Sequence, residues 1–394
     1  VAQLSVRILY VEFKTFVARH DEELAFADSS AFDDPPTELY GQFLTGLFGD
    51  GFKRLCLEYP VYSRLLAMRL NQWCVALREL FDRLSNDRAA LADRFNSGDP
   101  LGDVTDVAPL ADDTHGDGRA VVAVTFESDT RIVYKPRPIE GMVSFYGLLD
   151  RLDRHLSVPS FDQPRWLQRD GYGYVEWIEH HEAEDDAAAD RYYRRAGSLV
   201  CLSYAFEFED CHFENLIAAG EQPLLIDGET FLAPYVEPST REIPEQIAPV
   251  VAGTVHASML LPFGIGLLGN DGELGQAGMS GIGTDSDRVE LPSVTRPRIE
   301  AANTDVMTVV QEAPSFRRAT NTLEVNGTAC PPADYVEALV DGFTETHRTL
   351  RRLSDADRLF GEILDGSILP GIENRFVYRA TQQYASTVRS LCSR

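Results

Sequence analysis

The sequence predicts an α+β fold with two lobes, in which short strands lie among many helices. Three observations support this prediction. The first part of the chain has a helical pattern, two β-branched runs then form a hairpin, and the rest consists mostly of helices around short strands. With 394 residues, the chain is long enough for two or three domains or for one large two-lobed enzyme.

The amino-terminal part is predicted to be helical from residue 1 to about residue 91. In YSRLLAMRLNQWCVALRELFDRL, residues 62–84, the apolar side chains fall largely on one helical face, and we interpret this stripe as core rather than as a cofactor site. The stripe consists of Leu65, Leu66, Met68, Leu70, Trp73, Leu77, Leu80, Phe81 and Leu84. Gly and Pro in NSGDPLGDV then end the helix. We therefore expect a shortened helical domain over residues 1–97.

A second domain is expected over residues 98–198. RAVVAVTFE and TRIVYKP are rich in β-branched residues and flank a short turn, which is typical of a hairpin. GMVSFYGLLDRLDRHL, residues 141–156, is predicted to be a helix, and GYGYVEWIE, residues 171–179, a strand.

The third domain is expected over residues 199–394. A helix over residues 189–206 leads into it, LLID at 224–227 is a short apolar strand ending in an acid, and 332–353 form another helix. RFVYRATQQYASTVRSL, residues 375–391, reads as a strand that turns into a helix.

The composition restricts the partners and the compartment. There are 62 acidic residues against 36 basic ones, a net charge of −26, and only Lys14, Lys53 and Lys135 are lysines. Such an acidic surface argues against non-specific nucleic-acid binding and is typical of a protein from a salt-rich source. The six cysteines form no CxxC pair, which favours reduced thiols in a cytoplasmic protein. No run of eighteen apolar residues predicts a transmembrane segment.

One polar constellation stands beside apolar segments in DCHFENLIAAGEQPLLIDGE. Asp210 and Asn215 are five residues apart, and Asp227 follows twelve residues later at the end of a predicted strand. Phosphoryl transfer needs an acid near the attacking hydroxyl, an amide oxygen on Mg²⁺ and a second acid that holds the metal. Upstream, IVYKP resembles the strand whose lysine pairs with ATP phosphates, and Lys135 persists in a chain that otherwise prefers Arg.

A glycine turn precedes the hairpin. Gly116 and Gly118 in DDTHGDGRA could cover phosphates with backbone N–H groups, although glycines alone equally fit a plain turn. His115 alone fits an ordinary surface histidine equally well.

Taken in order, these motifs resemble the dehydratase domain of class II (LanM-type) lanthipeptide synthetases. The match runs through DDTHGDGR, RIVYKPR, EDCHFENLI, PLLIDGETF, NTDVM and RFVYRATQQY, from about residue 112 to residue 384. The resemblance implies a fold similar to a lipid kinase with extra helices. It also implies ATP- and Mg²⁺-dependent phosphorylation of Ser and Thr in a precursor peptide, followed by phosphate elimination to dehydroalanine or dehydrobutyrine.

The resemblance also implies a role for each matching residue. Lys135 contacts the ATP phosphates, Asp210 orients or deprotonates the peptide hydroxyl, and His212 lies beside the transferred phosphate. The expected metal site is Asn215, Asp227 and Glu229. The residues that complete the expected active site are Asp113 and His115 in the glycine turn, and Arg375 and Thr381 for the elimination step. An Arg suits elimination because its planar fork can bind a departing phosphate dianion.

The family also has a carboxy-terminal cyclase that binds zinc, and nothing here matches it. We therefore expect no zinc, and a cyclase domain or protein outside this chain. Two alternatives stay open: a small-molecule or lipid-type kinase without elimination, and an inactive fragment that binds a leader peptide. The R-x-x-x-R-x-T segment favours a dehydratase over a simple kinase, and the intact set of Lys135, Asp210, Asn215 and Asp227 argues against an inactive binder.

Overall fold

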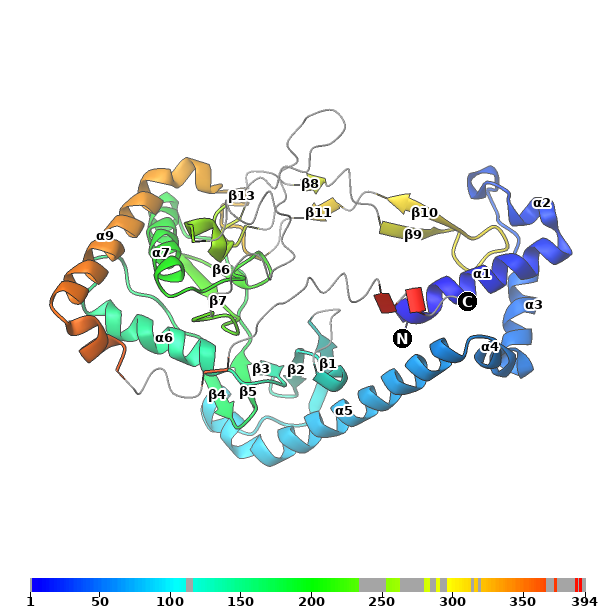
Figure 1. The fold of residues 1–394 in the computed structure, drawn as a ribbon, viewed down its shortest axis with the longest axis horizontal. Helices are drawn as coiled ribbons and strands as arrows, with labels where there is room; N and C mark the ends of the chain where they lie inside the picture. Colours follow the sequence, from blue (N-terminus) through cyan, green and yellow to red (C-terminus); the bar gives the residue numbers. More distant parts are fainter. Residues whose placement is uncertain are drawn as a thin grey trace.

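A computed structural model describes residues 2–110, 116–233, 253–262, 280–283, 288–290, 296–312, 315–317, 320–365, 372–373, 387–388 and 390–391. Helices and antiparallel strands occupy separate stretches of the chain, which confirms the predicted α+β class. Figure 1 shows a group of amino-terminal helices at one end and the main body at the other, joined along one side by α5. None of the described helices has the length and apolar character needed to cross a membrane.

The amino-terminal part is helical, as predicted. Its elements are α1 (Ala2–His20), α2 (Glu22–Ala25), η1 (Ser29–Ala31), α3 (Glu38–Gly46), η2 (Leu47–Gly51), α4 (Phe52–Glu58) and α5 (Pro60–Phe95). Two small clusters of apolar side chains hold α1 to α3, α4 and the start of α5. Pro60 at the first position of α5 fits a helix start, because the missing N–H would have no helical partner there.

The apolar stripe of α5 is only partly core, which corrects the prediction. Leu66, Leu80 and Leu84 are buried, but the side chains of Met68, Leu70, Trp73 and Phe81 are between 45% and 59% exposed. The helix packs against the amino-terminal helices near its start and against the sheet near its end. Its middle therefore leaves apolar side chains uncovered by the residues that the structure describes.

The sheet contains five antiparallel strands in the order β1-β2-β3-β5-β4. They are β1 (Val104–Pro109), β2 (Val122–Phe126), β3 (Arg131–Lys135), β4 (Trp166–Arg169) and β5 (Tyr172–Glu176). The predicted hairpin is confirmed as β2–β3, with Val122 opposite Tyr134. The carboxy-terminal part of α5 covers one face of the sheet through Leu80, Leu84 and Leu91. Helix α6 (Glu140–Asp153) follows β3, where a helix was predicted.

The largest core lies between α6, α7 (Asp186–Ala205), α9 (Val336–Asp355) and the hairpin of β6 (Leu216–Ala219) and β7 (Gln222–Leu225). Strand β7 ends two residues earlier than the predicted strand, so Asp227 lies in the following turn. Around this core lie η5 (Val255–Ser258), β12 (Glu324–Val325), β13 (Thr328–Ala329), η6 (Pro332–Tyr335) and η7 (Leu359–Ile363). In the segment predicted to turn from strand to helix, the described residues 387–388 and 390–391 are helical.

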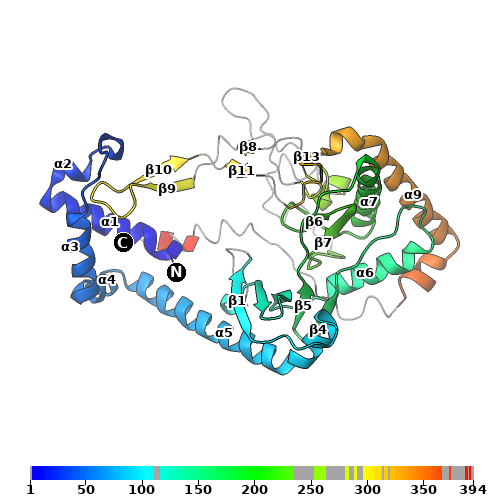
Figure 2. The same cartoon turned by 180° about the vertical axis from the view of Figure 1, so that it is seen from behind.

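Two short strand pairs lie between the ends of the molecule. They are β8 (Arg288–Glu290) with β11 (Ser315–Arg317), and β9 (Arg296–Glu300) with β10 (Thr308–Glu312). Both views place β9 and β10 beside α1 (Figures 1 and 2). The buried carboxylate of Asp305 accepts hydrogen bonds from the backbone N–H groups of Leu39 (3.2 Å) and Tyr40 (2.7 Å). The start of α3 is thus attached to a segment more than 260 residues later in the sequence.

Candidate active site

Lys135 is the last residue of β3, and its side chain is only 8% exposed. Its ammonium Nζ donates a hydrogen bond to the backbone oxygen of Ile226 (2.5 Å) and lies 3.8 Å from Oδ1 of Asp227. Two residues predicted for the same site, 92 positions apart, are therefore brought together. Burial of a charged ammonium is costly, so a nearby carboxylate is the partner that physical chemistry requires.

The electrostatic environment of Lys135 has two opposing parts. Burial is the largest influence and lowers the pKa of the ammonium below its ordinary value of 10.5. The carboxylate of Asp227 opposes this shift of the pKa, and the nearby guanidinium of Arg137 adds to it. A partly dehydrated ammonium of this kind is well suited to pair with an incoming anion.

Arg137 is the residue that the sequence analysis missed. Its Nη2 lies 2.5 Å from Oδ2 of Asp227, and its Nη1 pairs with Oε2 of Glu229. The guanidinium is 16% exposed and thus bridges two of the three expected metal ligands. A signal was present, because Arg137 is the fourth residue of the YKPR motif and lies on the same side of Pro136 as the site. A second cation so close to Lys135 had no assigned purpose in the sequence.

The turn after β7 carries Asp227 and Glu229, and it packs tightly against α6. The backbone N–H of Glu229 donates to Oδ1 of Asp227 (3.3 Å). Gly228 lies against the start of α6, where a Cβ on Gly141 would come within 2.1 Å of the Gly228 oxygen. A side chain at either glycine would separate the two elements, so both positions require glycine to bring the acidic turn close to β3.

The loop of residues 210–215 supplies the other expected site residues. Asp210 has a positive φ of 61°, and its Oδ1 lies 3.5 Å from Nε2 of His212. The side-chain amide Nδ2 of Asn215 donates to the backbone oxygen of Asp210 (2.7 Å), and the backbone oxygen of Asn215 accepts from the N–H of Ile226 (2.9 Å). The loop is thus tied to the strand end that carries Asp227.

Whether this set suits Mg²⁺ can be judged from its donor atoms. Because Nδ2 of Asn215 donates to Asp210, its Oδ1 is the amide atom that remains to accept or to coordinate. In the described parts of the chain, no three His, Cys, Asp or Glu side chains come together as a metal cluster. Mg²⁺ is usually held by one or two protein oxygen ligands together with phosphates and water, so Asn215 with Asp227 fits that ion.

The glycine turn lies in η3 (Gly116–Gly118) and packs on α5. Gly118 has a φ of 82°, and a Cβ there would come within 2.8 Å of Cβ of Gln72. Because Val122 of β2 lies opposite Tyr134, the chain that leads into β2 approaches the end of the sheet that carries Lys135. No contact between Gly116 or Gly118 and the acidic residues of the site is described, so their phosphate-binding role stays a prediction. Asp113, His115, Arg375 and Thr381 lie outside the described residues.

Comparison with known proteins gives two matches. The family described as "Domain of unknown function (DUF4135)" matches residues 59–394, which is most of the chain. The lacticin 481/lactococcin biosynthesis protein LcnDR2 of Lactococcus lactis subsp. lactis is 24% identical over 352 residues. The match covers 86% of this chain and 36% of that protein, so the chain spans little more than a third of the length of this relative.

Proposed function

The chain belongs to the DUF4135 family and corresponds to the dehydratase region of class II lanthipeptide synthetases, and from this premise we propose that it dehydrates Ser and Thr in a precursor peptide. The reaction has two steps: ATP-dependent phosphorylation of a side-chain hydroxyl and elimination of the phosphate. A two-lobed kinase-like fold with extra helices is part of the proposal. The observation that carries it is the contact of buried Lys135 with Asp227, in a turn tied through Ile226 to Asn215.

In the first step, the peptide hydroxyl oxygen forms a bond to the terminal phosphorus of ATP, and ADP leaves. Asp210 accepts the hydroxyl proton, because its carboxylate is a third exposed and belongs to a loop fixed by two backbone-mediated contacts. His212 lies close enough to Asp210 to orient that carboxylate.

The two buried cations stabilise the phosphate charge. Lys135 and Arg137 lie together with the carboxylates of Asp227 and Glu229, so the site keeps its charges compensated before a nucleotide arrives. Asn215 and Asp227, supported by Glu229, would hold Mg²⁺, which when bound neutralises charge on the transferred phosphoryl group. Binding of Mg-ATP would compete with Arg137 for Asp227.

In the second step, a base removes the Cα proton of the phosphorylated residue, a carbon–carbon double bond forms, and the Cβ–oxygen bond breaks to release phosphate. Arg375 and Thr381 are the residues proposed to stabilise the leaving phosphate, because they match the family motif for elimination. Asp113 and His115 are proposed to complete the same site.

Mass spectrometry of a precursor peptide incubated with the protein and Mg-ATP tests the proposal. Wild type should remove water from Ser and Thr. The variant Asp227→Asn should lose phosphorylation by roughly a hundredfold or more, because it weakens both the metal site and the partner of Lys135. Asp129→Asn is a matched control, because Asp129 lies in the exposed β2–β3 turn and Asn tolerates its positive φ.

The same measurement separates the alternatives. Stable phosphopeptide without water loss would favour a kinase without elimination. Binding of the peptide with no ATP-dependent change in mass would favour an inactive leader-peptide binder. An Asp227→Asn variant with wild-type phosphorylation would contradict the metal assignment.

A further inference from the structure

Helix α9 has one buried face and one exposed face. On the buried face, Gly342 packs against the backbone of α7, where an added Cβ would meet the Arg194 oxygen at 1.9 Å. The hydroxyls of Ser198 and Thr346, both buried, are 2.7 Å apart. This tight packing fixes α9 to the core, so its exposed face is a rigid surface.

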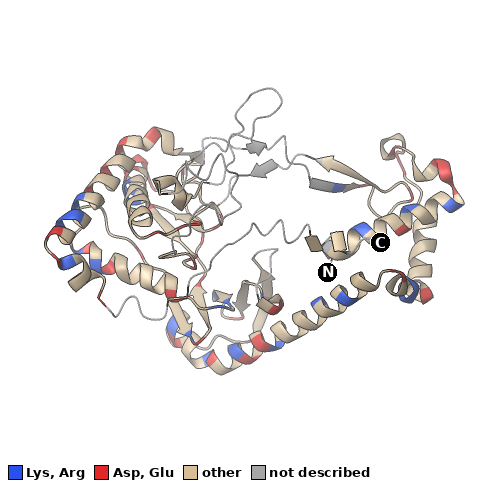
Figure 3. Cartoon of the chain, viewed as in Figure 1, with Lys and Arg blue, Asp and Glu red and all other residues tan. Residues whose placement is uncertain are grey.

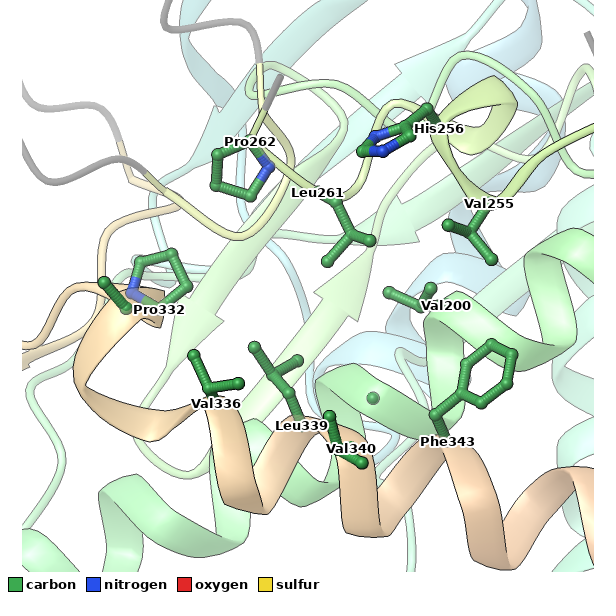
Figure 4. A pocket seen from close by; sticks show the side chains of 12 residues that line it. Val200, Val255, His256, Leu261, Pro262, Pro332, Val336, Leu339, Val340 and Phe343 are labelled. Carbon is green, nitrogen blue, oxygen red and sulfur yellow. The ribbon is translucent and has the colours of Figure 1, made fainter. Parts of the chain in front are cut away.

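The first half of that face lines an apolar cavity of about 530 Å³. Val336, Leu339, Val340 and Phe343 of α9 line one side, facing Val255 and Leu261 across the cavity (Figure 4). Val336 and Val340 are 53% and 56% exposed, which is unusual for valines at the edge of a cavity. Nothing among the described residues covers them.

The second half of the same face forms a basic groove. His347, Arg348, Arg351 and Arg352 line it together with Asp355 and Ala356, and all four basic side chains are exposed. The ring of His347 stacks on that of Phe343, with centroids 6.3 Å apart, so the apolar cavity continues into the groove. Figure 3 shows this concentration of blue on the half of α9 at the left edge of the molecule.

The positive charge of the groove is not neutralised in the way that charge nearby is. Arg358 pairs with Glu362 at 2.7 Å and Arg151 with Asp365 at 2.8 Å, whereas no ion pair is described for Arg348 or Arg351 within the described part of the chain. Cations near the carboxyl end of a helix are favoured by its dipole, which accounts for Arg352 in the last turn. That effect fades within one turn and does not account for His347 or Arg348.

We propose that the exposed face of α9 is a docking surface for a peptide segment with apolar residues beside acidic ones. Val336, Val340, Phe343, His347 and Arg351 recur at intervals of three or four residues, so they form one stripe. The stripe is about 22 Å long at 1.5 Å per residue, which matches an extended segment of about seven residues. Charge complementarity selects an acidic partner, which is unusual for a chain with a net charge of −26.

The choice of a peptide as the partner rests on the proposed function, since the substrate proposed there is a peptide. The docking surface is also connected to the candidate active site. Val255 and His256 of η5 line the apolar cavity, and the backbone oxygen of Ser258 at the end of η5 accepts a hydrogen bond from the N–H of Cys211 (2.9 Å). Cys211 follows Asp210 directly. A peptide held on α9 would therefore lie against the turn that supports the catalytic loop.

Fluorescence anisotropy with synthetic peptides tests the docking surface without ATP. The probes are fluorescein-labelled peptides of about ten residues, one with Leu and Val followed by Glu, and one with Lys in place of Glu. The acidic probe should bind more tightly, and added salt should weaken it. Replacing both Arg348→Glu and Arg351→Glu should raise Kd about tenfold or more, because two attractions become repulsions. Val336→Ser with Val340→Ser should raise Kd several-fold through lost apolar contact.

The double variant Arg64→Glu and Arg78→Glu is the matched control, because both side chains are exposed on α5 and the change in net charge is the same. Equal weakening by the control, no preference for the acidic probe, or tighter binding of a labelled oligonucleotide at the same face would each overturn the docking surface. Peptide dehydration by a wild type that ignores the acidic probe would refute only this inference. Conversely, specific binding without any ATP-dependent change in mass would refute only the proposed function.

Discussion

At the scale of single residues, the candidate active site depends on how Lys135 is compensated. Its ammonium has one carboxylate partner at 3.8 Å, a backbone oxygen at 2.5 Å and a second cation, Arg137, sharing that carboxylate. The chain uses Arg almost everywhere else, and a guanidinium at this position would be larger and could not reach the Ile226 oxygen as a compact donor. This compensation makes the charge state of Lys135 sensitive to Asp227.

We predict that Lys135 titrates below 10.5 and that Asp227→Asn lowers its pKa further, because burial remains while the opposing carboxylate charge is lost. Between the lowered pKa and 10.5 the unfolded chain binds more protons, so raising the pH through this window stabilises the folded state. NMR of ¹³C-labelled lysines suits the measurement, since the chain has only three. Lys135→Arg assigns the signal, and Lys14 reports on burial without such a site, since burial also lowers its pKa. A Lys135 pKa that rises in Asp227→Asn would contradict the contact.

At the scale of elements, α5 is attached to the sheet by a polar cluster as well as by leucines. The buried carboxylate of Asp87 accepts hydrogen bonds from Nε of Arg169 (2.7 Å), the Tyr172 hydroxyl (2.8 Å) and the Tyr174 hydroxyl (3.1 Å). Burial, together with Asp87, raises the pKa of Tyr172 to about 12. These tyrosines therefore stay protonated and act as donors over the physiological range.

Asp87→Ala should lower the free energy of unfolding by about 1–3 kcal/mol, because it leaves buried donors without their acceptor. Asp87→Asn keeps one acceptor oxygen and should cost less. Urea unfolding followed by circular dichroism gives both values. If Asp87→Ala were as stable as wild type, the cluster would not contribute to holding α5 on the sheet.

The elements differ in how far the sequence could predict them. The β2–β3 hairpin and α6, α7 and α9 follow from local periodicity, which each segment carries within itself. The burial of α5 does not, because Trp73 and Leu84 obey the same helical period while only the end near Leu84 meets a partner. The pairing of Lys135 with Asp227 could be expected from motif order. The bridge made by Arg137 required the distances, since an Arg two residues from a Lys has many possible directions.

At the scale of the whole molecule, the described residues form two ends joined by α5 and, on the other side, by the segment that carries β9 and β10 (Figures 1 and 2). Lys135, Asp210, Asn215 and Asp227 all belong to the main body. The two proposed steps use different residues, since Arg375 and Thr381 follow the phosphoryl-transfer set by about 150 positions in the sequence. Phosphorylation and elimination should therefore be separable by mutation.

Mass spectrometry of a precursor peptide treated with Arg375→Ala and Mg-ATP tests this two-step account most directly. Wild type should show only the loss of water. The variant should leave phosphorylation largely intact and slow elimination, because the leaving phosphate loses its guanidinium partner. Its peptide should therefore gain the mass of phosphate and keep it, and Thr381→Ala should behave alike. Dehydration at the wild-type rate without any phosphopeptide would contradict the account.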